Sequence, residues 1–106
     1  MVESLDVVFQ ALSNEPRRIM LSALAEGERT VGDLAGPFAM SLAAVSKHLK
    51  VLEGAGLVER RVEGRTTVCR LRPGPLSEVR EWVAFVERFW AERLDRLERL
   101  LVEDGG

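Results

Sequence analysis

Hydrophobic and polar residues alternate with helical spacing along most of this chain. Near its start, four large apolar residues lie three, four and three positions apart, on one face of a helix: Val2, Leu5, Phe9 and Leu12. A second helix is expected over 15–26, because Asn14 can cap it and Pro16 suits its first turn. Gly27 is a natural residue to end that helix.

Two closely spaced helices are expected in the middle of the chain. Thr30 can cap a short third helix over 31–35, which Gly36 and Pro37 end. After a tight connection, a fourth helix over 41–53 repeats the three, four, three spacing of large apolar residues: Leu42, Val45, Leu49 and Leu52. A short helix, a turn and a second helix with a polar outer face are typical of a helix-turn-helix unit, whose second helix enters the DNA major groove.

A hairpin and a long helix complete the pattern. The segments 57–62 and 66–71 are rich in β-branched residues and flank Gly64, which indicates a β-hairpin over 57–71. After a break at Pro73-Gly74-Pro75, apolar residues recur on a broad face of a helix expected over 76–102. The sequence therefore predicts one domain over 1–106 that is mainly α with a small β-hairpin. Its order, α-α-α-α-β-β-α, is that of a winged helix-turn-helix.

The two terminal helices are expected to form a dimer interface. A helix of about 26 residues extends about 39 Å, longer than a core of this size can cover. An exposed apolar face usually marks an interface, so we expect a two-fold homodimer. The expected contact residues come from the first and last helices: Val2, Leu5, Phe9, Trp82, Phe85, Val86, Phe89, Trp90, Leu94 and Leu97.

Composition adds limits to this picture. The chain has 106 residues, of which 46% are hydrophobic and 30% are charged, as in an ordinary globular domain. No apolar run approaches the roughly 20 residues that span a bilayer, and the N-terminus lacks the layout of a signal peptide. A single cysteine cannot form an internal disulfide, which fits a reducing compartment. We therefore expect a cytoplasmic protein of bacterial type with no membrane partner.

The charge is unevenly distributed along the chain. The net charge is −2, which alone disfavours nucleic acid as a partner. However, residues 41–72 contain seven Lys and Arg against three acids, a net +4, whereas 1–40 and 73–106 each carry −3. The only basic segment thus comprises the fourth helix and the hairpin. This distribution predicts a local binding surface for an anion, with double-stranded DNA as the expected partner.

The outer face of the fourth helix supplies the candidate DNA contacts. Small residues at Ala43 and Ala44 would allow close approach, and Lys47 is the residue most expected to contact a base or phosphate. A purely structural amphipathic helix, and a solvated hairpin with arginines that bind nothing, are the competing interpretations. The full candidate set joins this face to the hairpin: Ser41, Ala43, Ala44, Ser46, Lys47, His48, Lys50, Arg61 and Arg65.

Three stretches make the chain resemble the ArsR/SmtB family of bacterial winged-helix repressors. They are Ala11–Ile19, Ser41–Leu52 with its Val-Ser-Lys-His-Leu run, and Gly54–Arg61 with its Gly-Ala-Gly-Leu-Val run. The resemblance implies a cytoplasmic homodimer that binds a palindromic operator and blocks transcription. It also implies that Ser46, Lys47 and His48 contact DNA or flank the contacts, and that Arg61 and Arg65 belong to the wing.

The metal ligands of that family are missing. Its metal-sensing members carry a Glu-x-Cys-x-Cys-Asp-Leu motif, whereas Thr30 and Gly32 occupy both cysteine positions here. The only histidine is His48 and the only cysteine is Cys69, too few for a metal site within one subunit. A site made from both residues of two subunits would lie on the DNA-facing side. We expect no metal and no cofactor, and we expect Cys69 to be a buried structural thiol.

Other functions remain open at this point. A winged-helix module that binds another protein through its long helix, without binding DNA, is the main alternative. An enzyme is a distant third, because no nucleophile–base pair or carboxylate dyad is evident. An effector that controls DNA binding also stays open, because no residue pattern in the sequence marks a site for one. Arg17 and Arg18 could contact phosphate, although a structural ion pair is at least as consistent with the nearby acids.

Overall fold

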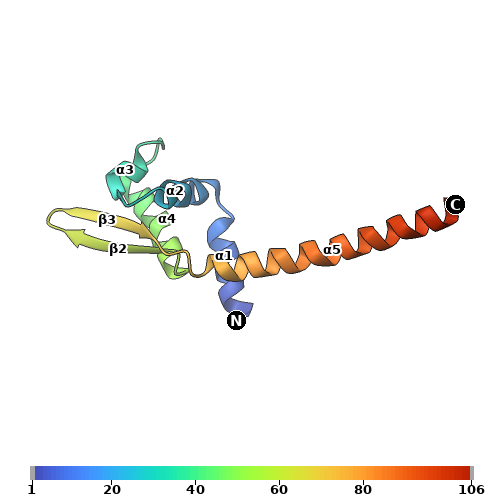
Figure 1. Cartoon of the computed structure of the whole chain (residues 1–106). Helices are drawn as coiled ribbons and strands as arrows, with labels where there is room; N and C mark the ends of the chain where they lie inside the picture. Colours follow the sequence, from blue (N-terminus) through green and yellow to red (C-terminus); the bar gives the residue numbers. More distant parts are fainter. Residues whose placement is uncertain (1, 106) are drawn as a thin grey trace.

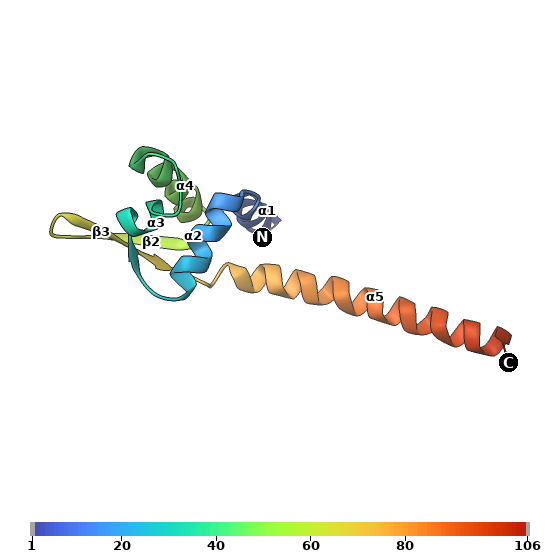
Figure 2. The same cartoon turned by 90° about the horizontal axis from the view of Figure 1, so that it is seen from above.

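The computed structural model describes residues 2–105 of the chain, with side chains described for 5–103. A small body of helices and a sheet carries one long helix that projects away from it (Figures 1 and 2). In chain order its elements are α1 (Val2–Leu12), α2 (Glu15–Ala25), β1 (Arg29–Thr30), α3 (Val31–Ala35), α4 (Leu42–Gly54), β2 (Val58–Glu63), β3 (Thr66–Leu71) and α5 (Leu76–Gly105). The expected winged helix-turn-helix order is confirmed, with one additional short strand.

The expected helix caps are present. The Asn14 side chain accepts a hydrogen bond from the backbone N–H of Arg17 at 3.1 Å. Thr30 and Asp33 form a reciprocal capping box at the start of α3. The Ser41 hydroxyl accepts from the N–H of Ala44 at 3.1 Å and begins α4. Each cap satisfies backbone donors that have no partner within the helix, so each start position is set locally.

One stripe of α4 lies at the centre of the hydrophobic core. Val45, Leu49 and Leu52 have no exposed surface. They pack in one cluster with buried residues of the other elements: Val8, Ala11, Met20, Leu21, Leu24, Leu34, Ala55, Leu57, Val58 and Cys69. This cluster holds α4 against α1, α2, α3 and the sheet, and leaves the opposite face of α4 outward.

One residue of the expected buried stripe, Leu42, is exposed in the structure. Its side chain is 59% exposed, although its spacing assigns it to the core face of α4. Leu42 is the first residue of the helix, and side chains of a helix lean toward its N-terminus. The side chain therefore extends beyond the point where the core ends.

The sheet contains a third strand that the sequence does not predict. β1 pairs antiparallel with β3, with Arg29 opposite Cys69 and Thr30 opposite Val68. The strand order is β1-β3-β2, so the second strand of the hairpin is the central one. A strand of two residues is too short to show alternation, which is why the pattern misses it. The hairpin itself is confirmed and turns at Gly64.

The last helix extends well beyond the body of the domain. α5 has 30 residues, and it continues past the expected end at residue 102 to Gly105. At about 1.5 Å per residue, it is about 45 Å long, and the molecule measures 72 Å along its longest axis. Figures 1 and 2 show that most of α5 projects away from the other helices and the sheet. None of the described helices is long and apolar enough to cross a membrane.

Gly56 shapes the connection between α4 and the hairpin. Its φ of +76° lies in the left-handed region, which side chains disfavour. A Cβ at this position would lie 3.3 Å from Cγ of Pro75, at the start of α5. The chain therefore turns and passes close to the α5 junction at the same residue.

A pair of glycine substitutions tests this geometry. Gly56→Ala should lower the free energy of unfolding by about 1–2 kcal/mol, because it adds left-handed strain and the close approach to Pro75. Gly54→Ala is the matched control, since Gly54 lies in α4 with nothing within 4 Å of an added Cβ. That control should be neutral or stabilising by up to about 1 kcal/mol. Urea unfolding at one fixed protein concentration measures both. Equal effects of the two substitutions would contradict the role assigned to Gly56.

Candidate nucleic-acid interface

The outward face of α4 forms a shallow, continuous surface. Five of the nine candidate DNA contacts line it: Ala43, Ala44, Ser46, Lys47 and Lys50. The structure therefore brings these residues together as the helical spacing predicts. Because Val45, Leu49 and Leu52 anchor the other side of the helix in the core, this face is held rigidly outward.

The two lysines of this face are free to bind an anion. Within the part of the chain that the structure describes, Lys47 and Lys50 form no ion pair, and both side chains are exposed. Ala43 is also exposed and Ala44 is half-buried. Two ammonium groups beside small side chains would allow a polyanion to approach the helix backbone closely.

The candidate serines hold α4 in place. Ser41 caps the helix through its hydroxyl oxygen. The Ser46 hydroxyl accepts a hydrogen bond from Arg60 at 3.1 Å, and Arg60 also forms an ion pair with Glu53 at 2.7 Å. Both Ser46 and Glu53 belong to α4, whereas Arg60 belongs to β2. Arg60 thus binds two positions of α4 that lie seven residues, or about two turns, apart, and it joins the helix to the wing, the β2–β3 hairpin.

His48 connects α4 to the first two helices. Its Nδ1 lies 3.3 Å from a guanidinium nitrogen of Arg17. Arg17 also donates to the carbonyl oxygens of Gln10 and Ala11, at 3.0 Å and 2.7 Å, at the C-terminal end of α1. The histidine is half-buried and lies within hydrogen-bond distance of Arg17.

The arginines at the start of α2, for which the sequence leaves phosphate contact and an ion pair open, bind backbone carbonyls instead of an acid. Neither Arg17 nor Arg18 forms an ion pair among the described residues. Arg18 donates to the carbonyl of Leu12 at 2.6 Å, and Arg17 binds carbonyls in the same turn. The last carbonyls of a helix have no partner within it, so they accept from these guanidinium groups.

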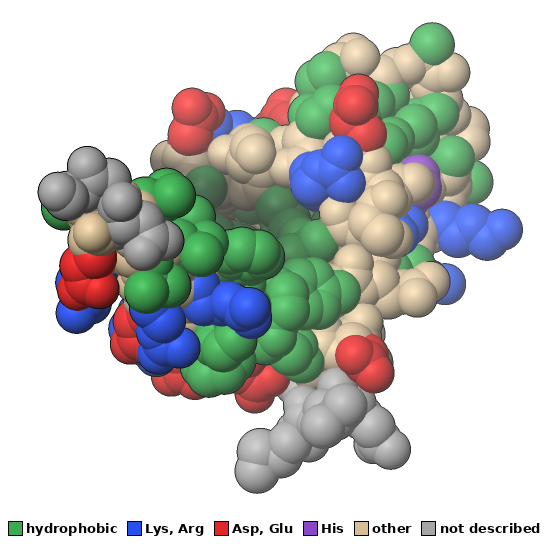
Figure 3. All heavy atoms as spheres, turned by 90° about the vertical axis from the view of Figure 1, so that its right-hand side faces the viewer, with side chains coloured by type: hydrophobic (Ala, Val, Ile, Leu, Met, Phe, Trp, Pro, Cys, Tyr) green, Lys and Arg blue, Asp and Glu red, His purple; other side chains and the backbone are tan. Residues whose placement is uncertain are grey.

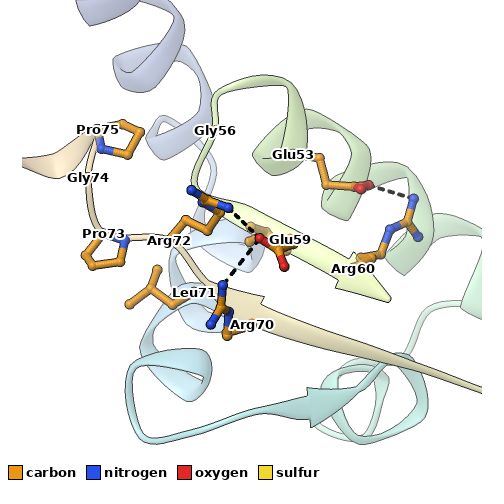
Figure 4. Close-up of a pocket in the computed structure, with 11 residues that line it drawn as sticks. Glu53, Gly56, Glu59, Arg60, Arg70, Leu71, Arg72, Pro73, Gly74 and Pro75 are labelled. Carbon is orange, nitrogen blue, oxygen red and sulfur yellow. Dashed lines mark hydrogen bonds and ion pairs between the residues drawn. The ribbon is translucent and has the colours of Figure 1, made fainter. Parts of the chain in front are cut away.

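Most arginines of the wing are engaged in ion pairs. Arg61 donates to both carboxylate oxygens of Glu28 at 2.8 Å, and it contacts Glu63 at 3.0 Å. Arg70 and Arg72 share the carboxylate of Glu59 (Figure 4). By contrast, Arg65 at the tip of the wing forms no ion pair within the described part of the chain. The structure therefore separates Arg65 from Arg61, which the sequence treats alike.

A cavity that is open to solvent lies at the base of the wing, next to the start of α5. Glu59 with its two arginines, Arg70 and Arg72, is called the Glu59 cluster below. Figure 4 shows this cluster on one side of the cavity and the Arg60–Glu53 pair on the other. Pro73, Gly74 and Pro75 complete its lining. Its acidic and basic side chains are paired with one another. Its lining comes from α4, from the wing and from the segment that leads into α5, so these three parts of the chain meet here.

The ion pairs keep these groups charged. The hydrogen bond from Arg61 lowers the pKa of the Glu28 carboxyl, and the same pairing raises the pKa of Arg61. The hydrogen bond from Arg72, with the charge of Arg70, lowers the pKa of Glu59. Both carboxylates are therefore ionised near neutral pH. Glu59 is already counted in the net charge of +4 for residues 41–72, whereas Glu28 brings one further negative charge to the wing from outside that segment.

Cys69 is a structural residue, as expected. Its side chain has no exposed surface and lies in the central strand of the sheet. Burial raises the pKa of the Cys69 thiol, so the less reactive protonated form is favoured.

The candidate dimer residues form an exposed apolar surface. Phe9 of α1 contacts Trp82 of α5 edge-to-face, with ring centroids 5.6 Å apart. Leu5 and Val86 are half-buried, and the side chain of Val2 lies outside the described residues. Figure 3 shows hydrophobic side chains gathered on the side toward which α5 projects. The large exposed residues of α5 are Trp82, Val83, Phe85, Phe89, Trp90, Leu94, Leu97, Leu100, Leu101 and Val102.

Comparison with known proteins links these features to bacterial regulators. Residues 14–60 match the family model described as bacterial regulatory protein, arsR family. Over 100 residues the chain is 38% identical to the HTH-type transcriptional regulator Rv2034 of Mycobacterium tuberculosis. That match covers 94% of this chain and 91% of the relative.

Solved structures share the same arrangement. A crystal structure of the ArsR family transcriptional regulator RHA00566 matches with a TM-score of 0.80 and 35% identity, over 86% of this chain and 94% of that one. A solution structure of the homodimeric winged helix-turn-helix DNA-binding domain Mb0332 from Mycobacterium bovis matches with a TM-score of 0.66 and 32% identity. It covers 87% of this chain and 85% of that domain.

The contacts of Arg60 that join α4 to the wing can be tested by replacing this residue. Arg60→Met should lower the free energy of unfolding by about 1–3 kcal/mol, because it leaves the half-buried Glu53 and Ser46 without their donor. Restoring neutrality with Glu53→Gln in the same chain should recover part of this loss. Arg70→Met is the matched control, since Glu59 keeps Arg72. It should cost less than about 1 kcal/mol. Urea unfolding of the unchanged chain, of Arg60→Met and Glu53→Gln alone, and of the double variant gives the coupling between the two residues. Zero coupling would contradict a direct link between Arg60 and Glu53.

Proposed function

The chain belongs to the ArsR family of bacterial regulatory proteins, whose winged helix-turn-helix domains bind DNA, and we propose that it is a homodimeric repressor of a palindromic operator. One observation carries this proposal. Lys47 and Lys50, which form no ion pair among the described residues, lie on the outward face of α4 together with small residues. A bacterial DNA-binding regulator acts at the chromosome, so we place it in the cytoplasm.

We assign different roles to the candidate DNA contacts. α4 enters the major groove, with Lys47 close to a base edge or phosphate and Lys50 at the backbone. Arg65 contacts DNA from the tip of the wing. Ser41, Ser46 and His48 hold α4 in position through the contacts described above. Arg61 supports the wing through Glu28 and reaches DNA only if that ion pair opens.

The apolar face of α5 supports a homodimer. A long row of exposed aromatic and aliphatic residues is unfavourable in water and is expected to be covered. A two-fold axis through α1 and α5 would bring two such faces together and present two copies of α4. Two recognition helices related in this way read half-sites about 34–36 Å apart, which explains a palindromic operator.

Repression requires only that the dimer occupies its operator. Activation would need a further surface that contacts the transcription machinery. Outside α1 and α5, the large exposed apolar residues of the described chain are few and scattered: Ile19, Leu42, Val51 and Val62. Isolated residues of this kind do not form a protein-binding patch. This distribution supports occlusion of promoter DNA as the mechanism.

We further propose that metal ions do not control this protein. The donor set supports this proposal, because the chain contains one histidine and one cysteine. The cysteine is buried in the sheet and the histidine contacts Arg17. Across the described side chains, no three His, Cys, Asp or Glu residues are grouped closely enough to hold a metal ion.

DNA binding by the lysine face can be tested directly. Lys47→Ala should weaken binding to a selected operator by about 1–3 kcal/mol if Lys47 reads a base, and relax the sequence preference there. If Lys47 contacts only phosphate, the loss should be uniform and the salt dependence should fall by about one unit of slope. Fluorescence anisotropy across a series of salt concentrations distinguishes these outcomes. Arg99→Ala, the matched control on α5, should bind like the unchanged chain.

The same titration tests the alternative function. A winged-helix module that binds only proteins would show no salt-dependent affinity for random duplex DNA at low ionic strength. That result for the unchanged protein would contradict DNA binding. Unchanged affinity of Lys47→Ala alone would remove only that residue from the interface.

The dimer can be tested with a charge on α5. Leu94→Glu should weaken dimerisation at least about 100-fold, because two buried leucines at about 1.5–3 kcal/mol each would be replaced by charges. Arg96→Glu is the matched control, since residues two apart point to different sides of a helix. Sedimentation equilibrium gives the dissociation constants. A Leu94→Glu protein that dimerises as tightly as the unchanged chain would place the interface elsewhere.

A further inference from the structure

The leading turn of α4 carries an exposed leucine whose position needs an explanation. Leu42 is the first helical residue, and its side chain is 59% exposed. By contrast, Val45, Leu49 and Leu52 are fully buried on the same helix. The Leu42 side chain extends past the start of the helix, which is the end of α4 that meets base edges in a helix-turn-helix.

The polar side chains nearest this turn are two serines that already accept hydrogen bonds within the protein, which leaves each O–H as a possible donor. Ala43 and Ala44 have no polar side-chain atoms. The Ser41 hydroxyl is held by the cap of α4, and the Ser46 hydroxyl is held by Arg60. Lys47 is the first side chain along α4 that is both polar and unpaired among the described residues. The first four helical residues of α4, 42–45, therefore carry no polar side-chain atom.

The major groove offers one apolar group on a base edge, the 5-methyl group of thymine. We propose that Leu42 is a specificity-determining residue that recognises a thymine methyl group in each operator half-site. This inference rests on the proposed function. Lys47 lies more than one turn further along α4, where it supplies the polar contact that Leu42 lacks. Ala43 and Ala44 leave room for the base edge to reach the leucine.

The opposite explanation is that Leu42 is exposed without a partner. Val51 provides the comparison, because it is an exposed apolar residue on the same helix. It lies nine positions later, about 13 Å further along the axis of α4, and therefore far from the leading turn of the helix. An effect of DNA methyl groups that depends on Leu42 and not on Val51 cannot come from exposed apolar surface in general.

The test removes the methyl group from the DNA. An operator is first selected with the unchanged protein, and each thymine of one half-site is then replaced by deoxyuridine, which lacks only the 5-methyl group. Loss of one buried methyl corresponds to about a fourfold weaker binding, or about 16-fold when both half-sites are changed. We expect this loss at one thymine position for the unchanged protein.

Protein variants assign that loss to its residue. Leu42→Ala should bind the thymine operator less tightly and should lose its sensitivity to deoxyuridine at the same position. Val51→Ala should keep the full sensitivity. A 5-methylcytosine·guanine pair at that position should bind the unchanged protein more tightly than cytosine·guanine, and Leu42→Ala should not distinguish the two. Urea unfolding of Leu42→Ala should match the unchanged protein, since the side chain is exposed.

The outcomes separate this inference from the proposed function. Failure to select any operator, together with no salt-dependent binding, would contradict the proposed function itself. A selected operator that is insensitive to deoxyuridine would overturn the role of Leu42 and leave DNA binding intact. Equal sensitivity of Leu42→Ala and the unchanged protein would assign the methyl contact to another residue, which overturns the inference as well.

Discussion

The burial of one stripe of α4 is the constraint on which the rest of the structure depends. Val45, Leu49 and Leu52 are enclosed by residues from α1, α2, α3 and the sheet. A helix anchored on one side by fully buried side chains cannot roll, so its opposite face is presented at a constant angle. Arg60 adds a polar constraint from the wing, because it binds both Ser46 and Glu53, which lie about two turns apart on α4. The outward face of α4 is therefore held in one orientation by the fold itself.

The local signals of the sequence predict the helices and their starts well. A cap such as Thr30 or Ser41 acts within three residues, so its effect is visible in the sequence alone. The buried stripe follows from periodicity for the same reason. Leu42 is the exception, because periodicity assigns a residue to a side of the helix and does not tell where along the helix the core ends.

The electrostatics of the wing could not be predicted in the same way. The composition indicates a basic hairpin, but the pairing register places Arg70 directly opposite Glu59. Arg61 reaches Glu28, which lies 33 positions earlier in the chain and next to a strand too short to detect. Such pairs depend on the tertiary fold. Of the two wing arginines predicted to bind DNA, the unpaired Arg65 is therefore better placed than Arg61.

The direction of α5 links the position of α4 to the arrangement of a dimer. The helix projects far from the body, and its apolar face begins beside the contact between Phe9 and Trp82 (Figure 1). The Glu59 cluster and the cavity at the base of the wing lie at its start. A second copy that covers α5 would therefore fix the direction of the helix, and with it the spacing of the two recognition helices. A change in the angle of α5 at Pro73–Pro75 would alter that spacing without any change within α4.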